Sequence, residues 1–214
     1  MIYVIKNYKI KKLEIQAGHC GPGNTLDVGF SANPNPYLSD AFGIDIKLPR
    51  KEFKNYKEVK ECNLNNNQIP YSDEFFSNVI AGDIIEHLEN PSAFLREVNR
   101  VLSNKNGRLI ISTPQANDWW TTLHNWFFRK IIKDPDPGEH LQNWTIIDMT
   151  RLLRKNGFTV EKLEGYYMHF PKINFRIRVK NFPILSWQVF YVARKVDIPK
   201  TSVLVNINNK WINV

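Results

Sequence analysis

The chain of 214 residues is 43% hydrophobic and 13% aromatic, which suffices for one packed domain, and it carries a net charge of +8. No stretch reaches the roughly 18 uninterrupted apolar residues of a membrane span, and Met1 to Lys12 lacks the apolar core of a signal peptide, so we expect a cytoplasmic protein. Cys20 and Cys62 lack the close spacing of zinc and redox motifs, so we expect no metal site.

The segments 26–29, 42–46, 59–64, 78–81 and 107–113 are apolar runs with Gly, Asp, Asn or Pro at or near their ends, which predicts short buried strands. A loop separates the first two. Between the last two, Pro91 begins a helix in which Phe94, Leu95 and Val98 recur at helical spacing. This succession is typical of an α/β fold with a doubly wound, mostly parallel sheet of the Rossmann-like kind.

The segment 115–143 interrupts this pattern, and we expect it to form a lid-like insertion. Apolar side chains fall on one stripe of a helix here, namely Trp119, Trp120, Leu123, Trp126, Phe127 and Ile131. Arg129, Lys130 and Lys133 add positive charge, and 134–138 predicts a stiff loop. Such a helix covers an apolar substrate, lies on a membrane surface or packs on the core, and the sequence leaves these three open.

The last third of the chain carries the whole excess of positive charge. Residues 151–214 contain 12 Lys and Arg against 3 Asp and Glu, whereas residues 1–150 contain 17 against 18. In 174–180, strict alternation places Phe175, Ile177 and Val179 on one face and three cations on the other. We therefore expect 165–185 to be a basic surface for an anionic substrate or a membrane, with an ordinary solvated face as the alternative.

Further along, Thr145 is expected to cap a helix, and 158–163 and 187–193 are expected to be strands. We predict one domain over residues 1–198. Residues 199–214 form a polar, β-prone C-terminal extension to which no function is assigned.

Polar residues follow the predicted strands where a parallel sheet binds its ligands, at the carboxyl ends. Asp45 ends the second strand, 18 positions after Asp27, and a carboxylate there is suited to accept from the two hydroxyls of a ribose. Gly29 would let a ligand approach the backbone of the first loop. The sequence therefore predicts a nucleoside site above the first two strands.

In combination, these segments resemble the class I S-adenosylmethionine-dependent methyltransferases, particularly the type 11-like branch. The resemblance covers about residues 24–165 and depends most on 69–80, on Glu86-His87-Leu88 and on the strand that ends in Ser112-Thr113-Pro114. It implies S-adenosylmethionine as the cofactor. One departure is that Ser31 stands where the family usually has a second loop glycine.

The resemblance also implies roles for individual residues. Asp27 and Gly29 would shape the methionine pocket, and Gly82 and Asp83 would border the sulfonium. Asp45 would hold the ribose. Adjoining residues complete the expected cofactor site, with the last two beside the adenine: Phe30, Ser31, Ile46, Asn63 and Leu64.

A base is needed only where the acceptor must lose a proton, and His140 and His87 are the candidates because imidazole titrates near neutrality. We expect Trp119, Trp120, Arg176 and Arg178 to bind the acceptor. Aromatic and basic residues together suit an anionic or phosphorylated small molecule, or a glycan-linked or lipid-linked acceptor, methylated on oxygen or nitrogen. Contact with a membrane surface remains open, and the sequence makes no prediction of the oligomeric state.

Other functions are less well supported. A degenerate fold without cofactor could serve as a binding module for nucleic acid or an anionic membrane. A nucleic-acid methyltransferase is disfavoured because Ala81-Gly82-Asp83-Ile84 stands where amine methylation of bases uses an Asn/Asp-Pro-Pro-aromatic loop. An oxidoreductase is disfavoured because Gly-x-Gly-x-x-Gly does not occur.

Overall fold

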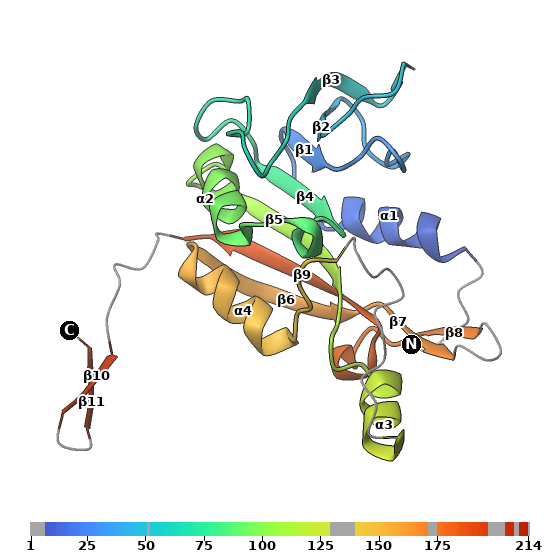
Figure 1. Ribbon diagram of the computed structural model, residues 1–214. Helices are drawn as coiled ribbons and strands as arrows, with labels where there is room; N and C mark the ends of the chain where they lie inside the picture. The colour runs from blue at the N-terminus through green and yellow to red at the C-terminus, as the bar shows by residue number, and fades with distance from the viewer. Residues whose placement is uncertain are drawn as a thin grey trace.

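The structure is a computed structural model, and it describes residues 7–50, 52–128, 140–170, 175–196, 204–207 and 210–213. A seven-stranded sheet forms its centre, with the strand order β3-β2-β1-β4-β5-β9-β6 (Figure 1). The strands are β1 Thr25–Val28, β2 Ala41–Asp45, β3 Tyr56–Glu61, β4 Asn78–Gly82, β5 Arg108–Pro114, β6 Phe158–Gly165 and β9 Gln188–Lys195. Neighbours among β1 to β5 pair in parallel, whereas β9 is antiparallel to both β5 and β6. The predicted mostly parallel α/β sheet is confirmed.

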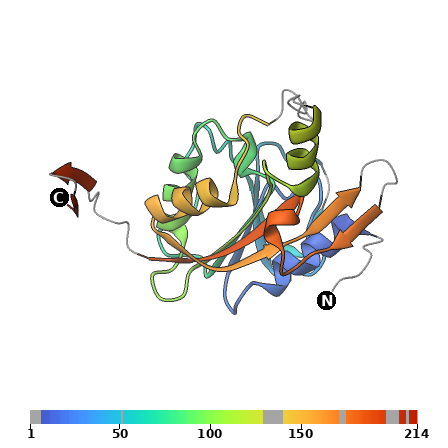
Figure 2. The same ribbon diagram turned by 90° about the horizontal axis from the view of Figure 1, so that it is seen from below.

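Two helices, α2 Pro91–Val101 and α4 Ile146–Lys155, cover one face of this sheet (Figure 2). Both begin at side-chain caps, because Asn90 accepts from the amide of Ala93 and Thr145 accepts from the amide of Asp148. The apolar stripes of the two helices enter the main core, which includes Val98 and Leu153.

The opposite face is covered by α1 Tyr8–Gly18, which packs near Leu38, Ala41, Ile80 and Ile110 through Ala17 (Figures 1 and 2). No helix was predicted from the sequence over these residues. Its apolar periodicity is weak, since its one fully buried side chain is the polar Gln16. The helix nevertheless lies close to the carboxyl ends of β1 and β4.

The connection from β1 to β2, residues 29–40, contains no helix, although parallel neighbours are usually joined through one. Aromatic packing takes the place of that helix. Phe30 is buried and its ring lies 4.5 Å from that of Tyr56 and 4.8 Å from that of Phe53. A Cβ at Gly43 would approach the Phe30 ring to 2.5 Å, so Phe30 lies directly on β2. The short loop is thereby held close to the tips of both strands.

The inserted region begins with α3 Trp119–Phe128, which projects from one end of the body (Figure 1). Its N-terminal end contacts β7 Tyr167–Phe170, where the rings of Trp119 and Phe170 lie 4.9 Å apart. Further along, Trp126 is 74% exposed and Phe127 is 64% exposed, so this part of the helix does not pack on the core. The rest of the predicted insertion, residues 129–139 with Arg129, Lys130 and Lys133, lies outside the described residues.

Three smaller elements complete the fold around the site. The strand β8 Phe175–Arg178 pairs with β7, the 3-10 helix η1 Ile85–His87 follows β4, and η3 Pro183–Leu185 precedes β9. In the C-terminal extension, β10 Leu204–Ile207 pairs with β11 Lys210–Asn213. Of the helices in the described parts of the chain, none has the length and apolar character that spanning a bilayer requires.

Candidate functional site

A cavity of about 280 Å³ lies at the carboxyl ends of β1 and β4, beneath α1. Five residues predicted for the cofactor line it, namely Asp27, Gly29, Phe30, Gly82 and Asp83. The opposite wall comes from α1, with Tyr8, Lys9, Lys12, Leu13 and Gln16. The α1 residues were missed from the sequence, although Lys12 and Gln16 are four positions apart and therefore share a helix face.

Gly29 turns the chain at the carboxyl end of β1. Its φ of +71° lies in the left-handed region, which glycine adopts without the steric cost that other residues pay. A Cβ there would also meet Cδ1 of Ile84 at 2.1 Å, so the Ile84 side chain would have to move. The positive φ is the stronger reason for glycine at this position.

Asp27 is a buried carboxylate in the wall of this cavity, and its Oδ2 accepts from the hydroxyl of Tyr56 at 2.6 Å. Burial raises the pKa of Asp27 to about 7, and the nearby Asp45 carboxylate acts in the same direction. The Tyr56 hydrogen bond and the Lys12 ammonium lower that pKa but do not outweigh the burial. Asp27 therefore changes charge near neutral pH in the protein without ligands.

The raised pKa of Asp27 makes the stability depend on pH. Below a pH of about 4 the group is protonated in both the folded and the unfolded chain, and its stabilising contribution is fully present. As the pH rises toward 7, the unfolded chain loses this proton first, so the contribution is lost and levels off above the folded pKa. Between pH 5 and pH 7.5 we expect Asp27 to account for a fall of about 2.5 kcal/mol in the unfolding free energy.

This prediction is tested by urea unfolding of the parent chain and of Asp27→Asn at both pH values. The amide has nearly the same shape and can still accept from Tyr56, but it does not titrate. The contributions of other titrating groups cancel in the comparison. Between the two pH values, the unfolding free energy of the parent should therefore fall by about 2.5 kcal/mol more than that of the variant. Equal losses in the two proteins would contradict the assignment.

Asp45 lies at the tip of β2 and holds the first loop in place. Its Oδ2 accepts from the amide of Ser31 at 2.9 Å, and its Oδ1 accepts from the amide of Ile46 at 2.7 Å. A carboxylate has about four acceptor directions, so roughly one on each oxygen remains for a ligand with two adjacent hydroxyls. Ser31 departs from the glycine of the family, yet its backbone is what ties the shortened loop to Asp45.

The residues predicted beside an adenine are not brought to the 280 Å³ cavity. The side chain of Asn63 accepts from the amide of Asn65, and its carbonyl accepts from Asn66 and Asn67, so it organises a turn. Leu64 borders a separate hollow formed with α2. Ile46, at the tip of β2, is 67% exposed.

Asp83 connects three elements at the far side of the cavity. Its carboxylate accepts from the hydroxyl of Ser112 at 2.9 Å and also bonds the side chains of Lys12 and Gln188. The side-chain amide of Gln16 donates to the same Ser112 hydroxyl at 3.2 Å. The network joins α1 to β5 and β9, so α1 is anchored over the carboxyl end of β4.

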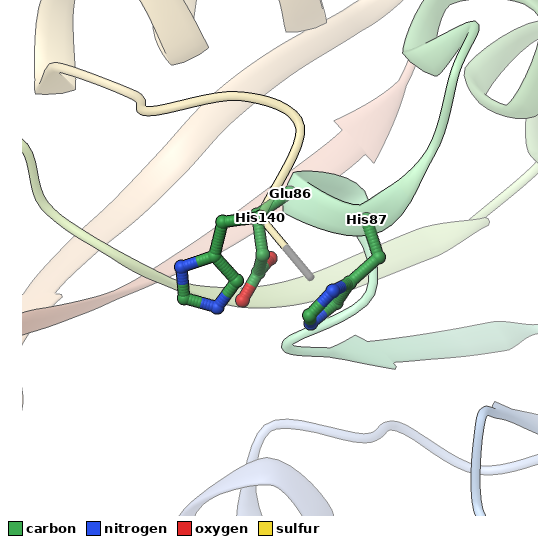
Figure 3. Close-up of side chains that lie close together, drawn as sticks. All are labelled: Glu86, His87 and His140. Atoms are coloured by element: carbon green, nitrogen blue, oxygen red, sulfur yellow. The ribbon is translucent and has the colours of Figure 1, made fainter. Parts of the chain in front are cut away.

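A second polar cluster consists of Glu86 and His87, which come shortly after Asp83 in the chain, and of His140 (Figure 3). Glu86 is buried, and its Oε2 accepts from the hydroxyl of Thr113 at 3.0 Å. The rings of the two histidines lie edge to face, 4.9 Å apart. The structure therefore brings together the two predicted catalytic histidines, which are far apart in sequence. Burial, followed by the nearby Asp83 carboxylate, raises the pKa of Glu86 to about 8.

Arg178 differs from the expectation of an outward-facing cation. It is 3% exposed and lies 3.2 Å from the Glu164 carboxylate, with further hydrogen bonds to the carbonyls of Gly165 and Tyr166. These contacts commit Arg178 to the fold, although it also borders a hollow of about 450 Å³ with Lys162 and Lys180. Arg176 is half-buried, and its guanidinium lies 4.4 Å from the centre of the Tyr8 ring.

An apolar groove of about 690 Å³ runs between α3 and η3. Trp119, one of the predicted acceptor residues, lines it together with Leu123, Trp126, Ile184 and Leu185. Trp120 is half-buried beside it, with its ring 5.6 Å from that of Trp119. The groove offers a large apolar surface to a ligand.

Comparisons with known proteins give a consistent result. The profile of a methyltransferase domain family matches residues 19–163. A solved S-adenosylmethionine-dependent methyltransferase from Thermotoga maritima, described as a possible histamine N-methyltransferase, is similar with a TM-score of 0.64 and 16% identity, over 87% of this chain and 89% of the other. Another such methyltransferase, from Aquifex aeolicus, gives a TM-score of 0.57 and 20% identity over 87% and 89% of the two chains. The comparison with curated proteins finds no match.

Proposed function

The chain belongs to the methyltransferase domain family, in which S-adenosylmethionine is the implied cofactor, and we propose that it methylates an oxygen or nitrogen of a small-molecule, glycan or lipid-linked acceptor. The observation that carries this proposal is the pairing of two polar sites at one edge of the sheet. The first site is the cavity between Gly29 and Asp83, and the second is the cluster of Glu86, His87 and His140.

The residues of the cavity, together with Asp45 at the adjacent tip of β2, fit the cofactor. The free acceptor directions of Asp45 suit the ribose diol, and the backbone at Gly29 can approach a ligand because no side chain intervenes. Lys12 and Asp27 offer charges to the amino-acid part. When bound, S-adenosylmethionine supplies a methyl group on a positively charged sulfur.

The work of the chain is then to align the acceptor and to exclude water. We assign the apolar part of the acceptor to the groove of Trp119 and Leu123, and its anionic part to the basic residues of 165–185 other than the buried Arg178. An acceptor hydroxyl or ammonium must lose a proton before or during transfer, and the cluster of Glu86, His87 and His140 is the place where it would do so.

Two measurements test the proposal. Calorimetric titration with S-adenosylhomocysteine should give micromolar binding, and incubation with methyl-tritiated S-adenosylmethionine should label a member of a panel of phosphorylated metabolites, anionic glycans and lipid-linked sugars. No binding at high concentration would favour the binding-module alternative. Labelling confined to nucleic acid would leave the fold assignment intact but would contradict the proposed acceptor class.

A further inference from the structure

Glu86, His87 and His140 converge from two separate parts of the chain. The first two belong to η1, directly after β4, and His140 comes from the segment that leads to α4. Figure 3 shows the two imidazoles on either side of the Glu86 carboxylate. Each residue offers one ligand atom, and these atoms all lie within 4.8 Å of one another.

We propose that these three side chains form a binding site for a divalent transition-metal cation. The inference rests on the proposed function and deepens it, because the cation would lie where the acceptor meets the methyl donor. With the cation bound, both imidazoles act as ligands, and the cation lowers the pKa of a coordinated acceptor hydroxyl. That proton then leaves to solvent as the methyl carbon moves from sulfur to the acceptor oxygen.

The spacing of the cluster is close to what a metal requires. Imidazole nitrogen and carboxylate oxygen bind such cations at about 2.0–2.2 Å, so the ligand atoms of a tetrahedral site lie about 3.5 Å apart. The three ligand atoms here lie within 4.8 Å of one another, so movements of about 1 Å bring them onto one ion. Both histidines are only half-buried, so their rings have room for that adjustment.

The second observation is a buried carboxylate oxygen for which the described part of the chain supplies no partner. Glu86 is 2% exposed, and while its Oε2 accepts from Thr113, its Oε1 is buried and accepts no hydrogen bond from the residues that the structure describes. Buried polar atoms are nearly always paired, because leaving one unpaired costs its full desolvation energy. A cation between Glu86 and the histidines supplies the partner that this oxygen lacks.

The surroundings hold the ligands in place before any cation arrives. The carbonyl of Glu86 accepts from the amides of Leu141 and Gln142 at 2.9 and 3.2 Å, which fixes the backbone of His140 against η1. The side chain of Gln142 also donates to the carbonyl of Leu88 at 3.2 Å. Together with the Thr113 hydroxyl on Glu86, these bonds orient the ligands, as outer residues do in established metal sites.

The ligand types indicate which cations bind. Two imidazoles and one carboxylate suit Mn²⁺, Fe²⁺, Co²⁺ and Zn²⁺, whereas Mg²⁺ and Ca²⁺ favour sites built from oxygen alone. From the sequence we expected no metal site, because the cysteines were the only ligands considered. Positions 87 and 140 are too far apart for any spacing motif to reveal them.

The test is direct cation binding to the full chain after dialysis against a chelator. Loss of the free Mn²⁺ signal in electron paramagnetic resonance, and visible absorption bands of bound Co²⁺, should each report one cation per chain. Glu86→Gln and His140→Asn should each weaken Mn²⁺ binding by about 100-fold, since even changes outside the ligand shell cost 10- to 100-fold. Mg²⁺ should compete poorly. The matched control is His169→Asn, which removes a half-buried histidine outside the cluster and should bind as the parent does.

Each other outcome is decisive. Absence of cation binding overturns the site. Binding of equal strength in the parent and both ligand variants also overturns it and means an adventitious ion only. Circular dichroism identifies a ligand variant that fails to fold, and His87→Asn then takes its place. Titration with S-adenosylhomocysteine in parallel separates the two proposals. Cofactor binding without cation binding refutes only the metal site, whereas cation binding without cofactor binding refutes only the proposed function.

Discussion

The variant Arg178→Met is expected to unfold with a free energy about 2–3 kcal/mol below that of the parent chain, because it removes one member of a buried ion pair while Lys162 still pairs with Glu164 at 2.6 Å. Arg178 and Glu164 are 3% and 5% exposed in their side chains and lie 3.2 Å apart. The variant also frees the carbonyls of Gly165 and Tyr166, which accept from the same guanidinium. Methionine preserves the apolar length of the side chain, so the loss reports charge and hydrogen bonds. Urea unfolding measures it.

The matched control for this variant is Lys180→Met. Lys180 pairs with the same carboxylate at 3.5 Å, but its side chain is 49% exposed, and exposed pairs contribute little because water and salt screen them. We expect its loss to cost less than about 1 kcal/mol. If the two variants unfold alike, Arg178 is not the structural residue that its burial indicates, and its assignment to the acceptor is open again.

Arg178 illustrates what alternation in a sequence can and cannot predict. The period of two correctly places residues of a strand on alternate faces, and β8 does form within 174–180. It does not reveal which face meets the rest of the protein. The carboxylate that neutralises Arg178 comes from β6, and the two strands belong to different sheets. Nothing local in the sequence marks that long-range pairing.

The parallel half of the sheet was the most predictable part of the fold. The strands β1, β2, β4 and β5 are short, buried apolar runs, and α2 carries both a cap at Asn90 and a clear apolar stripe. By contrast, β3 has no buried residue, and its predicted position, 59–64, lies a few residues beyond the observed Tyr56–Glu61. Edge strands have one exposed side, so their patterns are weaker.

The candidate site was predictable where it follows strand ends and unpredictable where distant segments meet. Asp27, Gly29, Gly82 and Asp83 lie where the parallel-sheet rule places them. The wall from α1 was missed because a polar helix face gives no apolar signal. The contact between His87 and His140 depends on how the chain returns from the insertion. Only the tertiary structure contains that information.

A second large effect is expected at the cofactor site, where Asp45→Ala should weaken S-adenosylhomocysteine binding by about 100-fold or more. The carboxylate offers one free acceptor direction on each oxygen to the ribose, and charge-assisted hydrogen bonds of this kind contribute at least about 1.5 kcal/mol each. Two such bonds correspond to about two powers of ten in affinity. The variant also releases the amide of Ser31, which loosens the loop that covers β2. Isothermal titration calorimetry measures the change.

Glu61→Ala is the matched control for Asp45→Ala. Glu61 ends the neighbouring strand β3, and its carboxylate also accepts from a backbone amide, that of Leu48 at 3.0 Å, but β3 lies one strand farther than β2 from β1 and the cavity. Glu61→Ala tests whether the loss of any carboxylate at a strand end weakens cofactor binding. The dissociation constant of this variant for S-adenosylhomocysteine should stay near the parent value. Affinity retained in Asp45→Ala would place the ribose elsewhere. Equal weakening in both variants would mean that the loops are disordered and that no specific contact with Asp45 was lost.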